Sequence, residues 1–331
     1  MATAHIYIGD ARQRLAELPA GSARTCVTSP PYFGLRDYGT ATWNGGDTDC
    51  DHLGKPMATK ANINRNCGTG NDVKNATARE FFRETCGKCG ATRIDSQIGL
   101  EDAPDAYVAE MVAVFREVWR VLADDGTLWL NLGDSFAKEK QLLGIPWRVA
   151  FALQADGWYL RSDIIWHKPN PMPESVTDRP TKSHEYLFLL TKSPRYYYDH
   201  EAIKEPAIYA GDDRGSRTDA RRGTGMNSMS GVTGETKNKR DVWTINTKPF
   251  RGAHFAVMPE ALVEPCVLAG SAEGDTVLDP FTGSGTVAVV ANRHGRNFVG
   301  TELNAEYAQI AYDRITGDAP MLNIVSVTPS H

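Results

Sequence analysis

The order of predicted elements in residues 276–302 constrains the fold of this chain more than any other feature. Thr276–Asp279 is a short apolar run that predicts a buried strand, and residues 287–291 begin a predicted helix. A glycine-rich turn lies between them, and such a turn lets backbone N–H groups approach a nucleotide-like ligand closely. The next predicted strand, residues 297–301, ends at Glu302, whose carboxylate can accept hydrogen bonds from both hydroxyls of a ribose.

Predicted strands and helices alternate along most of the chain. The clearest helix spans residues 104–122, where apolar side chains follow the spacing of a buried helical face and Pro104 suits the first turn. Further helices are expected at residues 146–154 and 258–268, and further strands at residues 5–8, 25–27, 127–132, 162–166 and 186–190. This alternation predicts an α/β fold with a mostly parallel sheet covered on both faces.

A second motif, Ser29-Pro30-Pro31-Tyr32, follows the apolar run 25–27. Two prolines fix their backbone angles and cannot donate hydrogen bonds, so their carbonyls are free to act as acceptors in a rigid loop. A hydroxyl precedes them and an aromatic ring follows. This combination suits a flat group with an exocyclic amine, such as a nucleobase flipped out of a duplex. Taken alone, such a motif is more often the simple end of a strand than a functional loop.

The glycine turn by itself also matches a dinucleotide-binding fingerprint, which would indicate a nicotinamide-dependent oxidoreductase. That turn does not need the preceding Asp279-Pro280-Phe281, and the Ser29–Tyr32 loop has no role in hydride transfer.

Together the two motifs resemble those of DNA amino-methyltransferases that use S-adenosylmethionine. Ser29–Tyr32 resembles the family's catalytic motif, and Asp279–Thr286 resembles its cofactor motif. The catalytic motif comes first, as in the permuted β group. The resemblance implies a three-layer, Rossmann-like class I methyltransferase fold with a mixed, mostly parallel sheet. It divides the chain into a catalytic half (1–39 and 99–200), an insert (40–98), a target-recognition segment (201–250), a cofactor half (251–317) and a C-terminal tail (318–331).

The resemblance also implies which residues bind S-adenosylmethionine. The expected contacts are Asp10, Phe255, Pro259, Asp279, Pro280, Phe281, Gly283, Ser284, Gly285, Thr286, Glu302 and Leu303. His254 is a further candidate beside the expected helix 258–268, which would line the methionine end of the cofactor. Asp10 has two interpretations that stay open together: a contact near the adenine, or an N-cap for the helix that follows.

Residues 40–98 are polar and glycine-rich, and they contain metal-ligand residue types at suggestive spacing. Cys50 and His52 are followed by Cys86 and Cys89, the latter pair in a Cys-x-x-Cys-Gly knuckle. A polar insert with a small hydrophobic core needs a metal ion or a cross-link to be stable. We therefore predict a structural zinc ion bound by these four residues. Cys67 is a fifth candidate, or a substitute for His52. The alternative is a surface loop with unrelated thiol and imidazole groups.

Composition sets the remaining limits. No run of 18 apolar residues predicts a membrane span, and the N-terminus lacks the pattern of a secretion signal. We therefore expect a cytoplasmic protein with reduced cysteines, and the resemblance implies a prokaryotic or phage origin. The formal net charge is −5, yet residues 211–240 are rich in arginine and lysine. This stretch either contacts DNA phosphates or forms a solvated linker. Its basic residues are Arg214, Arg217, Arg221, Arg222, Lys237, Lys239 and Arg240.

The residues of the catalytic motif predict the chemistry. The lone pair of an exocyclic amine is delocalised into the base ring, so the amine is a poor nucleophile. The Ser29 hydroxyl and the Pro30 carbonyl can accept its two protons, while Tyr32, with Phe33, stacks on the flipped base. Direct in-line methyl transfer needs no cysteine adduct, and Cys26 is predicted to be buried core.

Serine at position 29 resembles the cytosine-N4 enzymes of the family, so we expect a DNA cytosine-N4 methyltransferase. The alternatives are its adenine-N6 counterpart and, from another class, a non-catalytic zinc-containing protein that binds DNA. Double-stranded DNA is the expected partner. The resemblance also allows a homodimer and a cognate restriction endonuclease.

Overall fold

The computed structural model describes residues 2–34, 40–52, 85–137, 139–207, 235–248, 257–318 and 323–329. The chain divides into two compact units. The large unit combines Met1–Arg36 with Ile98–His331, and the small unit is Asp37–Gln97.

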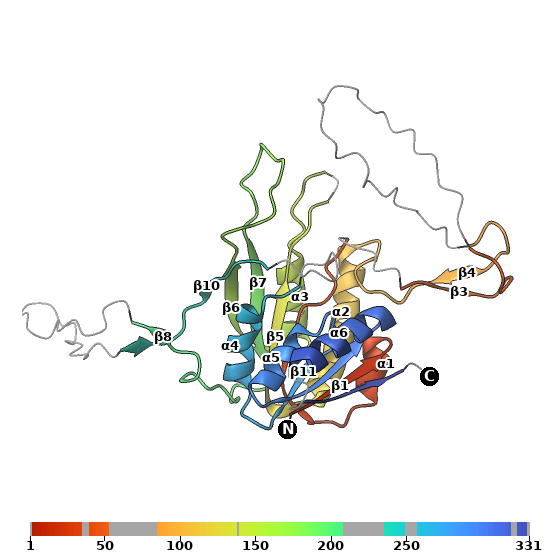
Figure 1. The fold of residues 1–331 in the computed structure, drawn as a ribbon. Helices are drawn as coiled ribbons and strands as arrows, with labels where there is room; N and C mark the ends of the chain where they lie inside the picture. Colours follow the sequence, from red (N-terminus) through yellow and green to blue (C-terminus); the bar gives the residue numbers. More distant parts are fainter. Residues whose placement is uncertain are drawn as a thin grey trace, which may run out of the picture. The chain divides into compact units, whose positions relative to one another are not determined.

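The large unit is built on a sheet of nine strands in the order β10-β6-β7-β5-β2-β11-β12-β1-β13 (Figure 1). The strand bounds are β1 Ala2–Ile8, β2 Ala23–Thr28, β5 Leu122–Leu132, β6 Tyr159–His167, β7 His184–Thr191, β10 Val242–Thr244, β11 Thr276–Asp279, β12 Asn297–Glu302 and β13 Asn323–Thr328. Only β7 runs antiparallel to its neighbours, β5 and β6, and every other pair is parallel. The expected mixed, mostly parallel sheet is confirmed.

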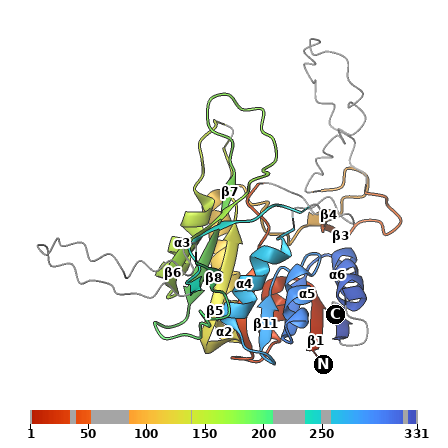
Figure 2. The ribbon, with the colours of Figure 1, turned by 60° about the vertical axis from the view of Figure 1, so that its left-hand side comes forward.

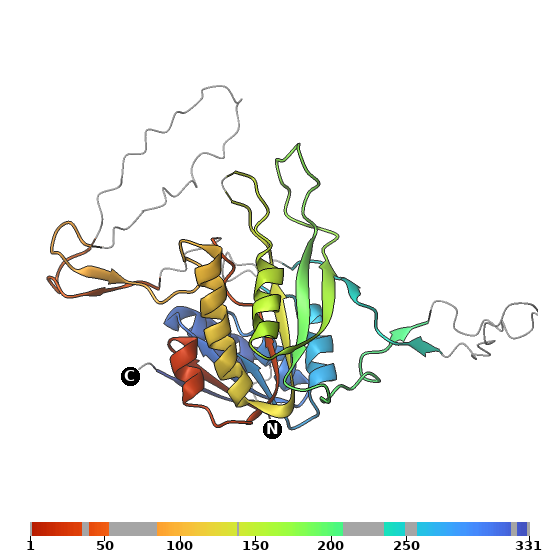
Figure 3. The ribbon, with the colours of Figure 1, turned by 180° about the vertical axis from the view of Figure 1, so that it is seen from behind.

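Helices cover both faces of this sheet. Figure 1 shows α4 (Glu260–Gly270), α5 (Thr286–Arg293) and α6 (Ala305–Asp318) on one face, and Figure 3 shows α1 (Ala11–Ala16), α2 (Pro104–Val121) and α3 (Ile145–Ala155) on the other. One apolar core lies under each set of helices. Burial of these side chains, at roughly 25 cal/mol per Å², is the main force holding the three layers together.

The expected helix at residues 104–122 ends slightly earlier in the structure. Its buried face includes Met111, Phe115 and Val118, none of which is exposed to solvent. The helix stops at Val121, and β5 begins at once with Leu122, so the strand is longer than the expected 127–132. No loop intervenes because Leu122 is itself buried in the same core.

The C-terminal residues differ from the expected tail. Asn323–Thr328 forms β13, which pairs in parallel with β1 at the edge of the sheet. Residues 201–250 also include regular structure. Val242–Thr244 adds β10 to the opposite edge, and β8 (Glu205–Pro206) pairs with β9 (Thr236–Lys237). Strands as short as β8, β9 and β10 carry little apolar signal, whereas β13 is rich in β-branched residues.

Among the described residues of the small unit, β3 (Thr42–Asn44) pairs antiparallel with β4 (Thr92–Ile94). In the large unit, the connection between β6 and β7 extends beyond the ends of these strands (Figure 2). Among the described residues, no helix combines the length and the apolar character needed to cross a membrane.

Candidate active site and candidate metal centre

The two sequence motifs meet at one edge of the large sheet. β2 and β11 are parallel neighbours, so Thr28 and Asp279 both end their strands at the carboxyl edge. The Thr28 hydroxyl donates a hydrogen bond of 2.6 Å to Asp279 Oδ1. The chain leaves β2 toward one face of the sheet and leaves β11 toward the other. Ligands of open α/β sheets bind at such a switch point.

Asp279 is buried, and its carboxylate is held by local donors. Oδ1 accepts the Phe281 N–H at 3.0 Å in addition to the Thr28 hydroxyl. Burial and, to a smaller extent, the charge of Glu302 raise the pKa of Asp279 to about 7, although both hydrogen bonds act in the opposite direction. The carboxyl therefore orders the start of the glycine turn.

The glycine turn places backbone groups toward the end of β12. Gly283 and Gly285 have φ of +52° and +77°, a region that favours glycine. The Gly283 N–H donates to Glu302 Oε2 at 2.8 Å, and the Pro280 carbonyl accepts the Thr301 hydroxyl at 2.6 Å. A side chain on Gly285 would meet Ala311 of α6 at 3.0 Å, so close packing also favours glycine there.

Glu302 connects three segments of the site. Besides Gly283, its carboxylate accepts the Asn304 N–H at 3.0 Å, and its carbonyl accepts the Gly9 N–H at 2.9 Å. Burial raises the pKa of the Glu302 carboxyl. Leu303 follows at once and is half-buried.

Asp10 takes the helix-capping role that the sequence allowed. Its Oδ1 accepts the Arg12 N–H at 2.8 Å at the start of α1, and its Oδ2 pairs with the Arg12 guanidinium at 2.7 Å. Burial would raise the pKa of Asp10, but the bonds and charge of Arg12 outweigh it and hold the pKa below its usual value. Because Gly9 contacts Glu302, Asp10 also lies at the same sheet edge.

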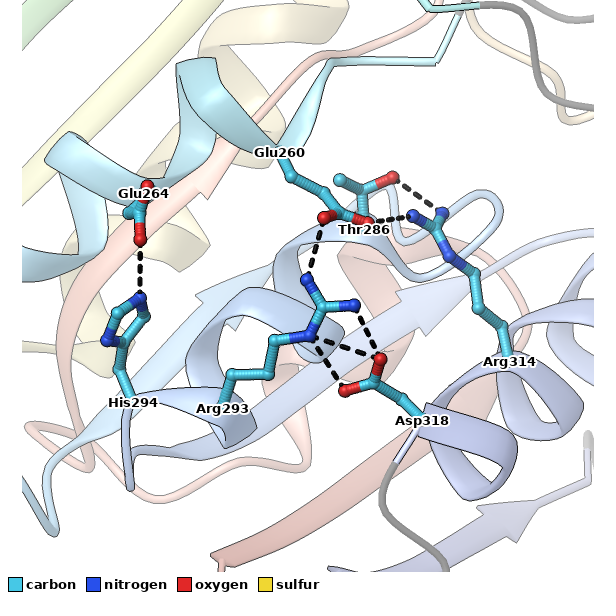
Figure 4. Close-up of polar contacts among 7 residues, drawn as sticks. All are labelled: Glu260, Glu264, Thr286, Arg293, His294, Arg314 and Asp318. Carbon is cyan, nitrogen blue, oxygen red and sulfur yellow. Dashed lines mark hydrogen bonds and ion pairs between the residues drawn. The ribbon is translucent and has the colours of Figure 1, made fainter.

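Arg314 of α6 braces the far side of the glycine turn (Figure 4). Its guanidinium donates to the Ser284 hydroxyl at 3.2 Å and to the Thr286 hydroxyl at 2.9 Å. It also pairs with Glu260 at 3.0 Å. Sequence reasoning did not find Arg314, because nothing in a helical arginine marks which turn it contacts.

Glu260 begins α4, and its second oxygen pairs with Arg293 of α5 at 2.7 Å (Figure 4). Pro259 is buried and forms the N-cap of α4, which begins two residues later than expected. The other two candidates beside this helix, His254 and Phe255, lie outside the described residues.

The Ser29–Tyr32 loop is anchored by polar residues from neighbouring strands. The Ser29 hydroxyl donates to Tyr32 Oη at 3.3 Å, and the Tyr32 hydroxyl donates to Glu185 Oε2 at 2.8 Å. The Pro31 carbonyl accepts the Tyr107 hydroxyl at 2.8 Å. The Pro30 carbonyl accepts no hydrogen bond from any described residue, so it keeps its acceptor capacity.

Asn131 and Glu185 were not predicted from the sequence. Asn131 lies near the end of β5 and donates its amide to Tyr32 Oη at 2.7 Å and to Glu185 Oε2 at 3.0 Å. Lys168, just after the end of β6, forms an ion pair with the same carboxylate. The available signal was one polar residue, Asn131, within the apolar run 128–132.

Gly133 leaves room for the Tyr32 ring. A Cβ at this position would lie 2.6 Å from Tyr32 Cε2, closer than atoms can approach. The missing side chain therefore determines where the ring packs.

In the small unit, the four predicted metal ligands come together. The ligand atoms of Cys50, His52, Cys86 and Cys89 all lie within 4.8 Å of one another. Cys50 Sγ and Cys86 Sγ are 3.9 Å apart, and Cys89 Sγ is 3.4 Å from His52 Nδ1. A tetrahedral zinc ion with ordinary bond lengths separates two sulfur ligands by roughly 3.8 Å, and sulfur from nitrogen by roughly 3.5 Å. The residues therefore fit a zinc ion.

The surroundings of the four residues also suit a metal. The Lys88 N–H donates to Cys86 Sγ at 3.4 Å. The N–H of Cys89, together with His52 and the Lys88 N–H, lowers the pKa of the Cys86 thiol to about 6. Trp43 stacks on the His52 ring with centroids 4.8 Å apart, which holds the imidazole in place. Cys67 lies outside the described residues.

Comparison with known proteins shows a family to which the sequence of this chain is similar. A DNA methylase family model (N6/N4 methyltransferases) matches residues 23–313. The type II methyltransferase M.Cfr9I of Citrobacter freundii is 42% identical over 343 residues, which cover 95% of this chain and 88% of its own. M.SmaI of Serratia marcescens is also 42% identical, covering 94% of this chain and 90% of its own.

Solved structures share the fold at lower identity. The putative DNA modification methylase TTHA0409 of Thermus thermophilus, in complex with S-adenosyl-L-methionine, is 23% identical with a TM-score of 0.57 and covers 98% of both chains. The PvuII DNA methyltransferase (cytosine-N4-specific) is 16% identical with a TM-score of 0.61, covering 98% of this chain and 95% of its own. The fold is thus the Rossmann-like fold of methyltransferases.

The chain belongs to the DNA methylase family, the S-adenosylmethionine-dependent amino-methyltransferases of DNA. The expected family is therefore confirmed.

Proposed function

We propose that this protein methylates the exocyclic N4 of cytosine in double-stranded DNA, with S-adenosylmethionine as methyl donor. The observation that carries this proposal is the hydrogen bond between Thr28 and Asp279. It brings the end of the catalytic motif's strand within 2.6 Å of the cofactor motif. Proximity of two bound reactants supplies a large part of the acceleration of such reactions.

The glycine turn and its neighbours suit the cofactor. Glu302 would receive the ribose hydroxyls, and the positive-φ backbone at Gly283 and Gly285 allows close approach of the ligand. Asp10, Pro259, Phe281 and Leu303 would complete the contacts, with Asp279, Pro280, Ser284 and Thr286 shaping the turn. The cofactor, when bound, supplies a methyl group already activated on a sulfonium.

The Ser29 loop suits an amine substrate. Its free Pro30 carbonyl and the Ser29 hydroxyl are acceptors for the two amine protons, whereas Pro31 is occupied by Tyr107. Asn131 Oδ1 is buried and has no hydrogen-bond partner among the described residues. A buried polar atom without a partner is costly, which favours a ligand or water at this place. The base would be flipped out of the duplex and stacked on Tyr32 with Phe33.

Cytosine is favoured over adenine by the side chain at position 29. The serine hydroxyl is a neutral group that accepts from the amine and can also donate to the ring N3 of cytosine. The adenine-N6 reaction is the second candidate, because the same acceptors suit its amine.

We further propose a structural zinc ion in the small unit, held by Cys50, His52, Cys86 and Cys89. The separations of 3.9 and 3.4 Å support this proposal. Four protein ligands leave no open position, so the metal would stabilise the fold of the unit and take no part in the reaction. Residues 201–250 would contact DNA, with their basic side chains on phosphates. The type II relatives make a cognate endonuclease a reasonable functional partner.

The test is incubation of the purified protein with duplex DNA and labelled cofactor, followed by mass spectrometry of the nucleosides. We expect N4-methylcytosine. N6-methyladenine alone would establish the second candidate, and DNA retention without any label would establish a non-catalytic binding protein.

Ser29→Ala is the matched variant. It removes the proposed acceptor without altering the cofactor turn, so turnover should fall about 10²-fold while cofactor affinity stays within about twofold. Full activity of Ser29→Ala would rule out the acceptor role.

A further inference from the structure

A continuous line of hydroxyl groups leads from the Ser29 side chain to a carboxylate on another strand. The Ser29 hydroxyl donates to Tyr32 Oη at 3.3 Å, and the Tyr32 hydroxyl donates to Glu185 Oε2 at 2.8 Å. Each member donates toward Glu185. Ser29 Oγ, at the opposite end, accepts the Asn131 amide at 3.3 Å and keeps its second lone pair for a further donor. Glu185 is thus the final acceptor of a chain of two hydrogen bonds, donated by the hydroxyls of Ser29 and Tyr32.

Glu185 reaches this position because β7 is the antiparallel strand of the sheet. The amino end of β7 lies at the same edge as the carboxyl ends of β5 and β6. Asn131 comes from β5, and Lys168 follows β6. A fully parallel sheet would have put the amino end of this strand at the other edge.

Charged and polar groups surround the Glu185 carboxylate. The titratable groups that face it are Lys168, Lys182, His184 and Tyr32, and Asn131 adds a neutral donor. The Glu185 and Lys168 side chains are 16% and 17% exposed. Burial lowers the pKa of Lys182 and of His184.

Methyl transfer to an amine creates a proton that has to leave. A bond forms between the amine nitrogen and the methyl carbon, and the bond between that carbon and sulfur breaks. The nitrogen then carries a positive charge until it loses one of its two protons. The Ser29 hydroxyl alone cannot keep this proton, because it already carries one. A further group therefore has to accept the proton.

We infer that Ser29, Tyr32 and Glu185 form a proton relay that removes this proton. The amine proton passes to Ser29 Oγ, the Ser29 proton passes to Tyr32 Oη, and the Tyr32 proton passes to Glu185. Both hydroxyls are regenerated, and Glu185 ends as a neutral acid that releases its proton to solvent. Lys168 positions the carboxylate through its ion pair. This inference rests on the proposed methyl transfer.

The Tyr32 hydroxyl suits a transmitting role. Burial, and then the charge of Glu185, raise the pKa of Tyr32 well above its ordinary value. The phenol therefore holds its proton at rest, and it releases that proton only as it receives another from Ser29.

The test compares Tyr32→Phe with wild type in single-turnover methyl transfer at saturating DNA and cofactor. Phenylalanine keeps the ring for stacking and removes only the hydroxyl, so the rate should fall about 10²-fold, within the usual contribution of general-base catalysis. The Kd for DNA should stay within about twofold. Glu185→Gln should lose rate similarly, and the decline in wild-type rate at acid pH should disappear in it.

A second readout needs no reaction. Carbon NMR of the Glu185 carboxyl, in the protein without cofactor, reports its hydrogen bonding. Tyr32→Phe removes the phenol donor, so the chemical shift of the Glu185 carboxyl carbon should change. Glu117→Gln is the control, because it breaks an ion pair with Arg120 on α2, away from the relay. It should leave the rate, its pH profile and the Glu185 carboxyl signal unchanged.

The outcomes separate two failures. An active wild type with a full-rate Tyr32→Phe would overturn the relay and leave the proposed function intact. An acid decline that persists unchanged in Glu185→Gln would also overturn the relay. A wild type that transfers no methyl group to DNA would overturn both.

Discussion

Thr28 and Asp279 are 251 positions apart in the sequence, yet their side chains share a hydrogen bond of 2.6 Å. The two residues end adjacent parallel strands, so this bond joins the loop of the catalytic motif to the turn of the cofactor motif. The permuted order of the motifs is compatible with one site because the sheet order places β2 beside β11.

The buried Asp279 carboxyl should make stability depend on pH. Its pKa rises from 3.8 to about 7 on folding, so the native state binds more protons than the unfolded state between these values. The contribution of this group to the free energy of unfolding is therefore present at acid pH and is lost as pH rises from about 4 to about 7. Asp279→Asn keeps an acceptor for Thr28 and Phe281 but cannot ionise.

Denaturant unfolding of Asp279→Asn and wild type at several pH values checks this. The variant should gain stability relative to wild type as pH rises through that window, and the two should converge near pH 4. Asp178→Asn, at an exposed carboxyl, should show no such trend. A constant difference between Asp279→Asn and wild type across the window would contradict the prediction.

Gly133→Ala should displace the Tyr32 ring. The added methyl would lie 2.6 Å from Cε2, so the ring has to move, and a small misplacement near the reacting groups can cost up to about 10²-fold in rate. Single-turnover methyl transfer measures this effect. Gly317→Ala in α6 is the control, since its Cβ would meet no atom within 4 Å. It should leave the rate unchanged and raise Tm slightly, and equal rates for both variants would refute a packing role for Gly133.

Arg314→Met should weaken cofactor binding about tenfold, as measured by calorimetry. The variant loses the bonds to Ser284 and Thr286 that brace the glycine turn, while the methionine keeps an apolar stem. Arg293→Met breaks a comparable pair of contacts, to Glu260 and Asp318, without touching the turn (Figure 4). Its cofactor affinity should change by about twofold or less. Similar losses of cofactor affinity in both variants would contradict the prediction. They would mean that the packing of the helices, and not the hydrogen bonds of Arg314 to the glycine turn, determines cofactor affinity.

Purified protein should contain about one zinc ion per chain by elemental analysis. Cys86→Ser removes the thiol whose pKa is lowered to about 6 and should lose the metal, because that thiol is the one best prepared to bind as thiolate at neutral pH. Cys67→Ser should retain it if the four clustered residues are the complete ligand set. Metal loss in Cys67→Ser, or a folded protein without metal, would disprove the assignment.

Local patterns predicted much of the fold. The apolar spacing of residues 104–121 specified a helix, because a buried helical face repeats within a few residues. The short spacings within Cys50-x-His52 and within Cys86–Cys89 likewise predicted which residues would cluster. β13 was missed although its residues, Asn323–Thr328, are mostly β-branched, because its partner β1 lies at the other end of the chain and no local pattern records that pairing.

The sequence by itself determined the two motifs, the alternation of elements and the family to which they belong, because these are written in contiguous residues. Only the tertiary structure decided that Asn131, Glu185 and Arg314 surround those motifs. Each lies on a different element and approaches through the strand order or through helix packing. Contacts of this kind depend on where distant elements pack, and no spacing along the chain records that.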